Sequence, residues 1–593
     1  MLVKDKIEFI QKLIKEKNID AYYVPTSDPH QSEYLAEHFK VRQFLSGFSG
    51  SRADLVITKD NSFIWVDGRY FTQADKELKD SGIEIFKMGE PGVLKLHEHL
   101  AKILPDNGVL AFDMGVCGVQ TKNIFVESLV KLKNIELKDI SLIDELWTDR
   151  PSLKSSPYFM LDEKFTGESV KNKLTRVRSY LNGTNNGIFV SALEDVAWVF
   201  NLRGKEIKNT PVFFSYAYIS NDEAIIFLNE DSCNEDILSM LNEANVRIQP
   251  YNSVNDFLSK LRSDIIYLDR RTLNSRIEIT LLENKGCKYL KFWDSPILLM
   301  RSLKNECEIE NFKKAHIKDG LALCKFIYWL KSNISNQEIS EFSAKVKLDE
   351  LRSENDLFIE PSFDSITAYA SNAAMMHYSA KEEGSSILKD EGLFLVDSGG
   401  QYYEGTTDVT RTIVLGKISD RQKECYTAVL KGMISLSKSK FLSGCSGADL
   451  DVLARAPIWD LELDYKCGTG HGVGFCLGVH EGPQGFRYGV YKEVLRSGMI
   501  LTNEPGVYIT DEFGIRIENQ LVVRNDINND SGQFMRFDYM TIAPIDLAAV
   551  NVEDLTKSEK DYLNSYHKNV YDTLSVFLND DEKRWLKQET RSI

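Results

Sequence analysis

Four carboxylates and one imidazole stand in glycine-rich or strand-like sequence, at Asp397, Asp408, His471, Glu504 and Glu518. Burying carboxylates close together is costly, because each raises the pKa of the others unless a positive charge compensates them. Two divalent cations carry four positive charges, which four carboxylates neutralise. If the five groups converge, the strands that flank them must meet at one site, so this set constrains the fold of the whole C-terminal half.

Two predicted hairpins carry the four carboxylates. Asp397 and Asp408 flank a Gly-Gly pair with β-rich sequence on both sides, and a hairpin there brings them together. Glu504 and Glu518 repeat this arrangement around a DEFG turn, with Glu518 expected in a half-buried strand. His471 lies in GTGHGVG, where glycines allow close backbone approach. Each residue alone is more often an ordinary structural or surface group, but the ordered set favours a two-metal hydrolase with manganese as the first choice.

Length and composition indicate an ordinary soluble protein of several domains. The 593 residues suggest about two to four domains, and 43% apolar and 27% charged residues are typical of globular chains. A net charge of -16 argues against nucleic acid and anionic membranes as partners. No apolar run approaches the roughly 18 residues of a membrane helix. Nine cysteines without a CxxC pair predict a reduced, cytoplasmic setting.

Two segments of the N-terminal half share one order of predicted elements. The first, IDAYYVP to DGRY, predicts a strand, a polar loop and a hairpin that turns at residues 59–61. The second, NGIFV to FLNE, repeats this order with a turn at residues 220–222, which indicates two related α/β domains in tandem. Joins are expected at WTDRPSLKSSP, from Trp147, and near Leu303. The predicted domains are therefore 1–152, 153–302 and 303–593.

Amphipathic helices are predicted at both ends of the chain and at the start of the third region. The last of them begins at a T-x-x-E cap formed by Thr556 and Glu559, inside a packed extension that starts at about residue 540. The predicted apolar faces, in chain order, are Ile7, Ile10, Leu13 and Ile14; then Ile309, Phe312, Leu323, Phe326, Ile327 and Leu330; then Tyr566, Val570, Leu574 and Phe577.

Short motifs specific to one family occur along nearly the whole chain. They include DPHQSEY, FLSGFSGS, DGRY, LWTDRPS, AHIKDGLAL, GTTDVTRT, GTGHGVG, VHEGPQG, NEPG, GIRIEN and FDYMTIAPID. In these motifs the chain resembles the long, three-domain form of the aminopeptidase P, or Xaa-Pro aminopeptidase, family. The resemblance implies two creatinase-like α/β domains, a pita-bread catalytic domain and a helical C-terminal extension. It also implies a manganese-dependent homodimer that removes an N-terminal residue preceding proline.

The resemblance implies a role for each candidate metal ligand. Asp397 would bind one metal ion, and His471 and Glu504 would bind the other. Asp408 and Glu518 would bridge the two ions, with a bridging water or hydroxide as the nucleophile.

Four further residues are implied around the metals. His377 would orient the substrate, His480 would stabilise the tetrahedral intermediate, and Arg516 would fix a metal-bound carboxylate and keep it ionised. Cys467 departs from the family, which carries a histidine at this position, and a thiol is the poorer hydrogen-bond donor. We favour a small buried hydrophobic role for Cys467 over a redox-sensitive thiolate.

Two alternatives remain open from the sequence. A prolidase, which cuts only Xaa-Pro dipeptides, would share the metal ligands, but the tandem N-terminal domains and the extension argue against it. A non-catalytic pita-bread module that binds proteins would generally have lost ligands, whereas all five are present here.

Overall fold

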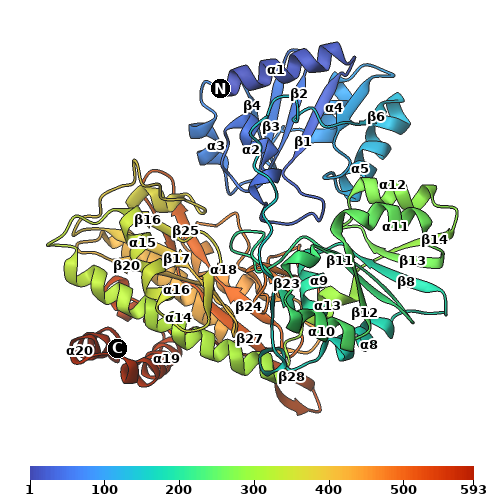
Figure 1. The fold of residues 1–593 in the computed structure, drawn as a ribbon. Helices are drawn as coiled ribbons and strands as arrows, with labels where there is room; N and C mark the ends of the chain where they lie inside the picture. Colours follow the sequence, from blue (N-terminus) through green and yellow to red (C-terminus); the bar gives the residue numbers. More distant parts are fainter. The chain divides into compact units, whose positions relative to one another are not determined.

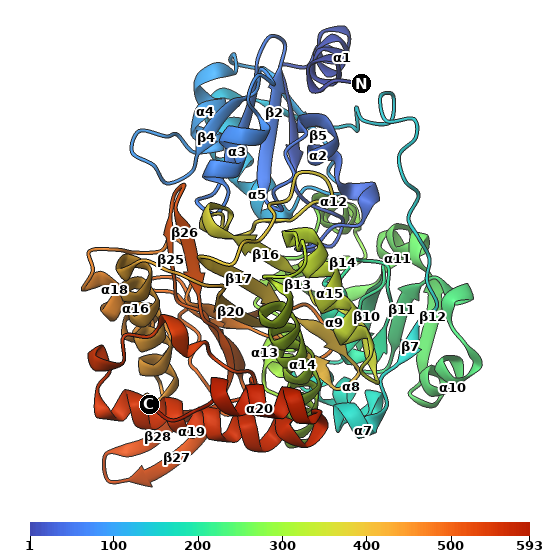
Figure 2. The ribbon, with the colours of Figure 1, turned by 90° about the vertical axis from the view of Figure 1, so that its left-hand side faces the viewer.

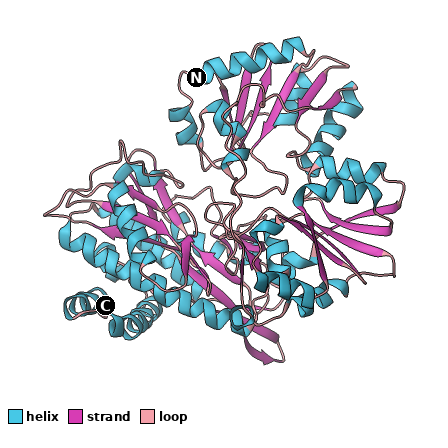
Figure 3. Cartoon of the chain, in the orientation of Figure 1, coloured by secondary structure: helices cyan, strands magenta, loops and turns pink.

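The computed structural model describes all residues from 1 to 593 and divides them into two compact units (Figure 1). The first unit comprises Met1–Leu161 and Glu168–Ile297, and the second comprises Asp162–Gly167 and Leu298–Ile593. Both units combine helices with sheets (Figure 3), as the predicted mixture of α/β and α+β domains requires. None of the helices has both the length and the apolar character needed to cross a membrane.

The first unit contains two six-stranded sheets with the same topology. Their strand orders are β4-β3-β2-β1-β5-β6 and β12-β11-β10-β8-β13-β14. In each sheet three neighbouring strands are antiparallel and the remaining pairings are parallel. The strands are β1 (Ala21–Pro25), β2 (Ala53–Thr58), β3 (Ser62–Val66), β4 (Glu84–Lys87), β5 (Val109–Phe112), β6 (Glu136–Asp139), β8 (Asn186–Val190), β10 (Tyr216–Ser220), β11 (Ala224–Leu228), β12 (Val246–Pro250), β13 (Ser263–Asp269) and β14 (Cys287–Trp293).

This shared topology confirms the two related domains in tandem. The β2–β3 hairpin turns at residues 59–61, as predicted. The β10–β11 hairpin turns at residues 221–223, one residue later than predicted. The N-terminal helix is α1 (Val3–Glu16), and its four predicted apolar residues are all buried. The other helices are α2 (Val41–Ser46), α3 (Phe71–Glu77), α4 (Leu96–Ile103), α5 (Val119–Phe125), α8 (Val170–Arg178), α9 (Leu193–Val199), α10 (Glu235–Glu243), α11 (Val254–Lys260) and α12 (Ser275–Glu283).

The second unit contains the long predicted helix, α14 (Glu306–Asn333), whose six predicted apolar residues are buried. Asn305 caps its first turn by accepting a hydrogen bond from the main-chain N–H of Glu308. Two C-terminal helices pack against α14 (Figure 2). The helices of this unit also include α15 (Glu341–Ser353), α16 (Asp420–Ser437), α18 (Val452–Trp459), α19 (Lys557–Leu574) and α20 (Asp580–Glu589).

The C-terminal extension is packed, with one correction to its predicted face. Thr556 and Glu559 form the predicted capping box at the start of α19. Tyr566, Val570 and Leu574 are buried, but Phe577 is 56% exposed. The prediction was wrong for Phe577 because α19 ends at Leu574, and the short 3-10 turn that follows carries Phe577 away from the buried face.

Four sheets of the second unit surround the acidic residues. One has the strand order β16-β17-β20, a second has the order β21-β28-β27-β24-β22-β23, and two small sheets are β15-β18-β19 and β25-β26. The strands are β15 (Phe358–Pro361), β16 (Ile366–Tyr369), β17 (Leu393–Ser398), β18 (Gly400–Tyr402), β19 (Gly405–Thr406), β20 (Val409–Val414), β21 (Lys440–Leu442), β22 (Gly470–Gly472), β23 (Glu481–Phe486), β24 (Ile500–Asn503), β25 (Gly506–Ile509), β26 (Phe513–Arg516), β27 (Asn519–Asn529) and β28 (Gly532–Tyr539).

Candidate metal centre

The antiparallel pair β17–β20 places the two aspartates side by side. Asp397, near the end of β17, lies opposite Thr410 of β20, and Asp408 comes directly before β20. The predicted hairpin is therefore present, with one addition. The connection between the two strands forms β18 and β19, which pair with each other, and β18 also pairs with β15.

The antiparallel pair β24–β27 brings the two glutamates together in the same way. Glu504 follows β24 and Glu518 precedes β27, and the adjoining Asn503 and Asn519 lie opposite each other. The chain between them forms the β25–β26 hairpin around the predicted turn. Glu518 was expected in a half-buried strand, but it lies in the break between β26 and β27 and is only 1% exposed.

His471 projects from β22, next to β24, towards the carboxylates. Its main-chain N–H donates to the Thr502 hydroxyl at 3.1 Å, which in turn donates to Glu504 Oε1 at 3.2 Å. The ring nitrogen Nδ1 lies 2.9 Å from the carbonyl oxygen of Gly472, so the tautomer with the proton on Nδ1 leaves Nε2 as a lone-pair ligand. The adjoining Gly470 is required, because a Cβ there would collide with the main chain of Thr502.

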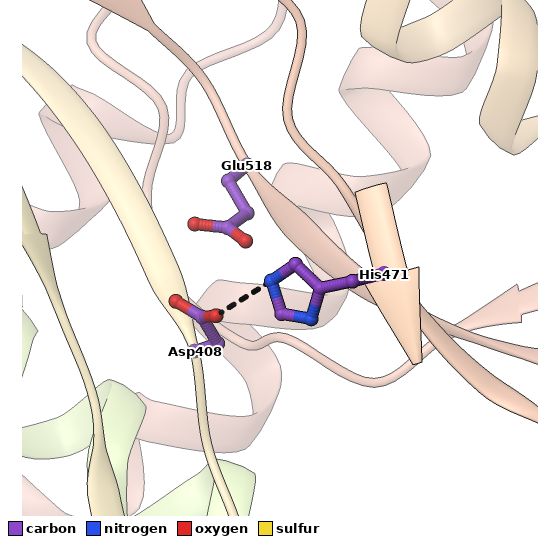
Figure 4. Close-up of side chains that lie close together, drawn as sticks. All are labelled: Asp408, His471 and Glu518. Carbon is purple, nitrogen blue, oxygen red and sulfur yellow. Dashed lines mark ion pairs between the residues drawn. The ribbon is translucent and has the colours of Figure 1, made fainter. Parts of the chain in front are cut away.

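Three of the five candidate ligands, Asp408, His471 and Glu518, form one cluster, and Glu504 lies next to His471. His471 Nε2 lies 3.4 Å from Asp408 Oδ2 and 3.4 Å from Glu504 Oε1. Figure 4 shows Asp408, His471 and Glu518 directed towards one another from three different parts of the chain, with ligand atoms that all lie within 4.8 Å. This spacing suits carboxylate and imidazole ligands of a shared cation.

The surroundings of the cluster disfavour the ionised form of three of its acids. Burial, partly offset by Arg516, raises the pKa of Asp397, and burial also raises the pKa of Glu504. Burial and the neighbouring acids together raise the pKa of Glu518 well above its usual range. Burial lowers the pKa of His471, but Asp408 and Glu504 outweigh that effect and bring it to about 9. Cations bound beside Asp397, Glu504 and Glu518 would favour the ionised form of these acids.

Two buried carboxylate oxygens support the same conclusion. Asp397 Oδ1 and Glu518 Oε1 make no hydrogen bond, although buried oxygen atoms normally have a partner. The remaining oxygens of these two groups are satisfied by Arg516 and Thr410 respectively. A divalent cation would occupy the unsatisfied side of each carboxylate, so the residues present fit a metal centre.

Arg516 connects the acids to two residues that were not identified from the sequence. Its Nη2 donates to Asp397 Oδ2, its Nη1 donates to the Tyr508 hydroxyl at 2.6 Å, and its Nε donates to Thr410 Oγ1 at 3.1 Å. Thr410 then donates to Glu518 Oε2 at 2.7 Å. Thr410 could have been found from the sequence, because it lies in the motif GTTDVTRT, two residues after Asp408. Tyr508 lies in no such motif.

The other predicted residues lie at different positions around this centre. The His480 ring packs edge-to-face on His471 with ring centroids 4.2 Å apart. Cys467 is partly exposed at the edge of an apolar cluster, and burial together with Glu504 raises the pKa of its thiol to about 11. His377 is exposed, in the turn that follows the 3-10 helix Ala370–Ala374.

Sequence profiles of known families cover nearly the whole chain. Residues 310–525 match metallopeptidase family M24, and residues 533–593 match the C-terminal region of peptidase M24. Residues 6–146 and 149–308 each match a creatinase/prolidase N-terminal domain.

Individual relatives extend the likeness over full length. Aminopeptidase P2 of Arabidopsis thaliana is 36% identical over 100% of this chain and 89% of its own. Xaa-Pro aminopeptidase 1 of Dictyostelium discoideum is also 36% identical, over 100% of this chain and 97% of its own. The crystal structure of an X-prolyl aminopeptidase from Caenorhabditis elegans, described as a cytosolic enzyme with a di-nuclear active site, covers 100% of both chains with a TM-score of 0.94 and 32% identity.

The fold and the acid-rich centre thus define a metallopeptidase of the M24 class, with two creatinase-type domains before a pita-bread domain and a helical C-terminal region. Within that class, full-length identity is decisive. The chain belongs to the aminopeptidase P, or Xaa-Pro aminopeptidase, family.

Proposed function

We propose that this chain is an aminopeptidase that hydrolyses the N-terminal Xaa-Pro bond of peptides with two divalent metal ions, Mn²⁺ being the first choice. The observation that carries the proposal is the convergence of Asp408, His471 and Glu518 within 4.8 Å, in a chain that is 36% identical to Xaa-Pro aminopeptidase 1 of Dictyostelium discoideum. Hard oxygen ligands favour Mn²⁺ over softer ions.

The five candidate ligands divide between the two ions. Asp397 would hold one ion, His471 and Glu504 would hold the other, and Asp408 and Glu518 would be shared. The position of His471 Nε2, equally distant from Asp408 and Glu504, supports this division. When bound, the ions supply a Lewis acid and an activated water at the scissile carbonyl.

Residues of the chain supply the remaining functions. Arg516 orients Asp397 through their hydrogen bond and favours its ionised form. His480, packed against the ligand His471, is placed to stabilise the negative charge that develops on the carbonyl oxygen. His377 orients the substrate. Because proline in the second position provides no N–H, the shape of the pocket must select it.

Cys467 occupies a position where the family carries a histidine. With the pKa of its thiol raised to about 11, the neutral form dominates at pH 7. A neutral thiol is a weak donor and cannot act as a cationic acid. This supports a role for Cys467 as a small apolar side chain at the edge of the pocket. Proton delivery to the leaving proline would then be slower than in relatives that carry histidine.

We also propose a cytoplasmic homodimer. The C. elegans relative is described as cytosolic, and all nine cysteines of this chain are free, which suits a reducing compartment. The homodimer rests on the family resemblance, and sedimentation of the purified protein tests it.

The deciding experiment compares metal-stripped protein with protein reloaded with Mn²⁺, Co²⁺ or Zn²⁺. The substrates are Arg-Pro-Pro, the dipeptide Arg-Pro and the control Arg-Ala-Pro. We expect Mn²⁺ to restore cleavage of Arg-Pro-Pro and not of Arg-Ala-Pro. Preference for the dipeptide would indicate a prolidase, and inactivity with every ion would indicate a non-catalytic module.

A further inference from the structure

Arg411, on β20, is a buried guanidinium that is 1% exposed and donates only to uncharged oxygens. On the side of the metal centre, its Nη1 donates to the main-chain carbonyls of Glu518 at 2.6 Å and Thr410 at 2.9 Å. Its Nη2 donates to the side-chain oxygen of Asn519 at 2.9 Å. Arg411 therefore holds the main-chain carbonyl of Glu518 and the side chain of the next residue, Asn519.

The same guanidinium also binds the C-terminal extension. Its Nε donates to the carbonyl of Pro544 at 2.9 Å, and its Nη2 donates to the carbonyl of Ala543 at 3.0 Å and to the Tyr566 hydroxyl at 2.9 Å. Tyr566 belongs to α19. One side chain thus connects the last long helix of the protein to the main chain of a candidate metal ligand.

Two consecutive residues, Thr410 and Arg411, bind the carboxylate and the main chain of Glu518. The Thr410 hydroxyl donates to the carboxylate oxygen Oε2 at 2.7 Å, while Arg411 binds the main-chain carbonyl. The main-chain N–H of Glu518 donates to the carbonyl of Thr410 at 3.1 Å. Since these contacts leave Glu518 little freedom, any displacement of Arg411 would be passed on to the carboxylate.

The extension is itself firmly anchored where it meets Arg411. The Tyr566 hydroxyl donates to the carbonyl of Ala543 at 2.8 Å, and His567 Nε2 accepts from the main-chain N–H of Ile545 at 3.1 Å. Tyr566 belongs to a buried core cluster, and His567 is fully buried. The segment that receives the Arg411 hydrogen bonds therefore has its position set by α19.

We propose that the C-terminal extension positions Glu518 through Tyr566 and Arg411, and that it thereby sets the affinity of the centre for divalent metal. The inference rests on the proposed function, because it takes Glu518 to be a metal ligand. Arginine is required for this connection, since its planar guanidinium carries donors on three nitrogen atoms, whereas lysine directs three donors from one nitrogen. Arg411 is thus a positioning residue that touches neither ion nor substrate.

The test uses full-length protein and Mn²⁺ alone. The variants are Tyr566→Phe, which removes one hydroxyl that binds Arg411, and Tyr562→Phe, one turn earlier on α19, whose buried hydroxyl is outside this chain of contacts. Competition with a chromogenic chelator measures the Mn²⁺ dissociation constant. We expect Tyr566→Phe to weaken binding by roughly 3- to 10-fold, less than the tenfold or more that is typical when a direct partner of a ligand is lost. Tyr562→Phe should match the wild type.

Thermal unfolding of the metal-free variants separates positioning from general stabilisation. If Tyr566→Phe lowers the melting temperature while Mn²⁺ affinity stays that of the wild type, the extension is only structural and the inference is overturned. Arg411→Lys is an independent variant should Tyr566→Phe fail to fold, and unchanged Mn²⁺ affinity in it counts equally against the inference. Wild-type protein that binds no Mn²⁺ would overturn the proposed function as well.

Discussion

Arg516 Nη2 donates a hydrogen bond of 2.5 Å to Asp397 Oδ2, with both side chains enclosed in the interior. The same guanidinium also reaches Tyr508 and Thr410, so three acceptors from separate segments depend on one planar group. Among the charged side chains described here, Arg516 is the cation that directly contacts the ligand cluster.

Replacing Arg516 with lysine is expected to lower kcat/KM by about 10- to 100-fold, as is typical when the partner of a metal ligand is lost. Lysine keeps the charge but cannot bind three acceptors in one plane. Steady-state kinetics at saturating Mn²⁺ measure the loss. The control is Tyr508→Phe, which removes one of the three contacts and should have a smaller effect. A lysine variant as active as the wild type would show that charge alone suffices.

Removing the metals should make stability depend on pH in the acidic to neutral range. Burial raises the pKa of Asp397, Glu504 and Glu518, so at these three sites the folded metal-free protein binds protons more readily than the unfolded chain does. Such groups stabilise the fold below their unfolded pKa values, and this contribution is lost as pH rises through the folded values.

From pH 5.5 to pH 7.5 the melting temperature of the metal-free wild type should therefore fall more, or rise less, than that of a variant that lacks one of these acids. Mn²⁺ at a hundred times its dissociation constant should add about 2.7 kcal/mol of stability at pH 7.5. Calorimetry with and without metal provides both measurements. The variant Glu518→Gln, which removes one of the buried acids, provides the comparison. The same pH dependence in the wild type and in Glu518→Gln would contradict a contribution from the buried acids.

Glu341, on α15, should control the loop that carries His377. It is fully buried, and its carboxylate accepts hydrogen bonds from the Tyr369 N–H, the Tyr378 hydroxyl and the Ser386 N–H at 2.7, 2.7 and 2.8 Å. These donors lie on both sides of His377 in the chain. A single carboxylate thus closes the base of the loop.

We expect Glu341→Gln to raise KM by about 10-fold with a smaller change in kcat, because uniform loss of substrate binding alters KM first. Glutamine keeps the volume but offers one acceptor oxygen instead of two. The matched control is Tyr369→Phe, whose hydroxyl binds the carbonyl of Glu391 and not Glu341. An equal change of KM in both variants would refute a specific role for Glu341.

Cys467→His should raise turnover on a Xaa-Pro peptide, because imidazole can donate and carry a proton near neutral pH, whereas this thiol has a pKa of about 11. Cys467→Ser is the control for size without an imidazole. Metal content is measured in parallel so that only fully loaded variants are compared. Unchanged or lower turnover in the loaded histidine variant would show that this position does not limit activity.

Local patterns predicted much of the fold. The apolar spacing of α1 and α14, the capping box at Thr556 and the hairpin turn at residues 59–61 depend on neighbours within a few positions, so the sequence displays them. Phe577 is an exception. The helical spacing of apolar residues continues to Phe577 in the sequence, but the helix ends at Leu574.

Long-range contacts could not be predicted in this way. Arg411 binds Glu518 and Tyr566, which lie 107 and 155 positions further along the chain, and Glu341 binds a loop that begins 28 positions later. Neither side chain differs in its local pattern from a surface residue. Their roles depend on which strands become neighbours, and only packing decides that.

By itself, the sequence determined which chemical groups are available: four carboxylates, an imidazole and the motifs of one peptidase family, since ligand identity is a property of the residues. The tertiary structure alone decided their distances, their burial and the hydrogen bonds that hold Glu518 from the C-terminal extension. The physical reason is that desolvation and charge interactions, which set both pKa and metal affinity, act through space between segments far apart in the chain.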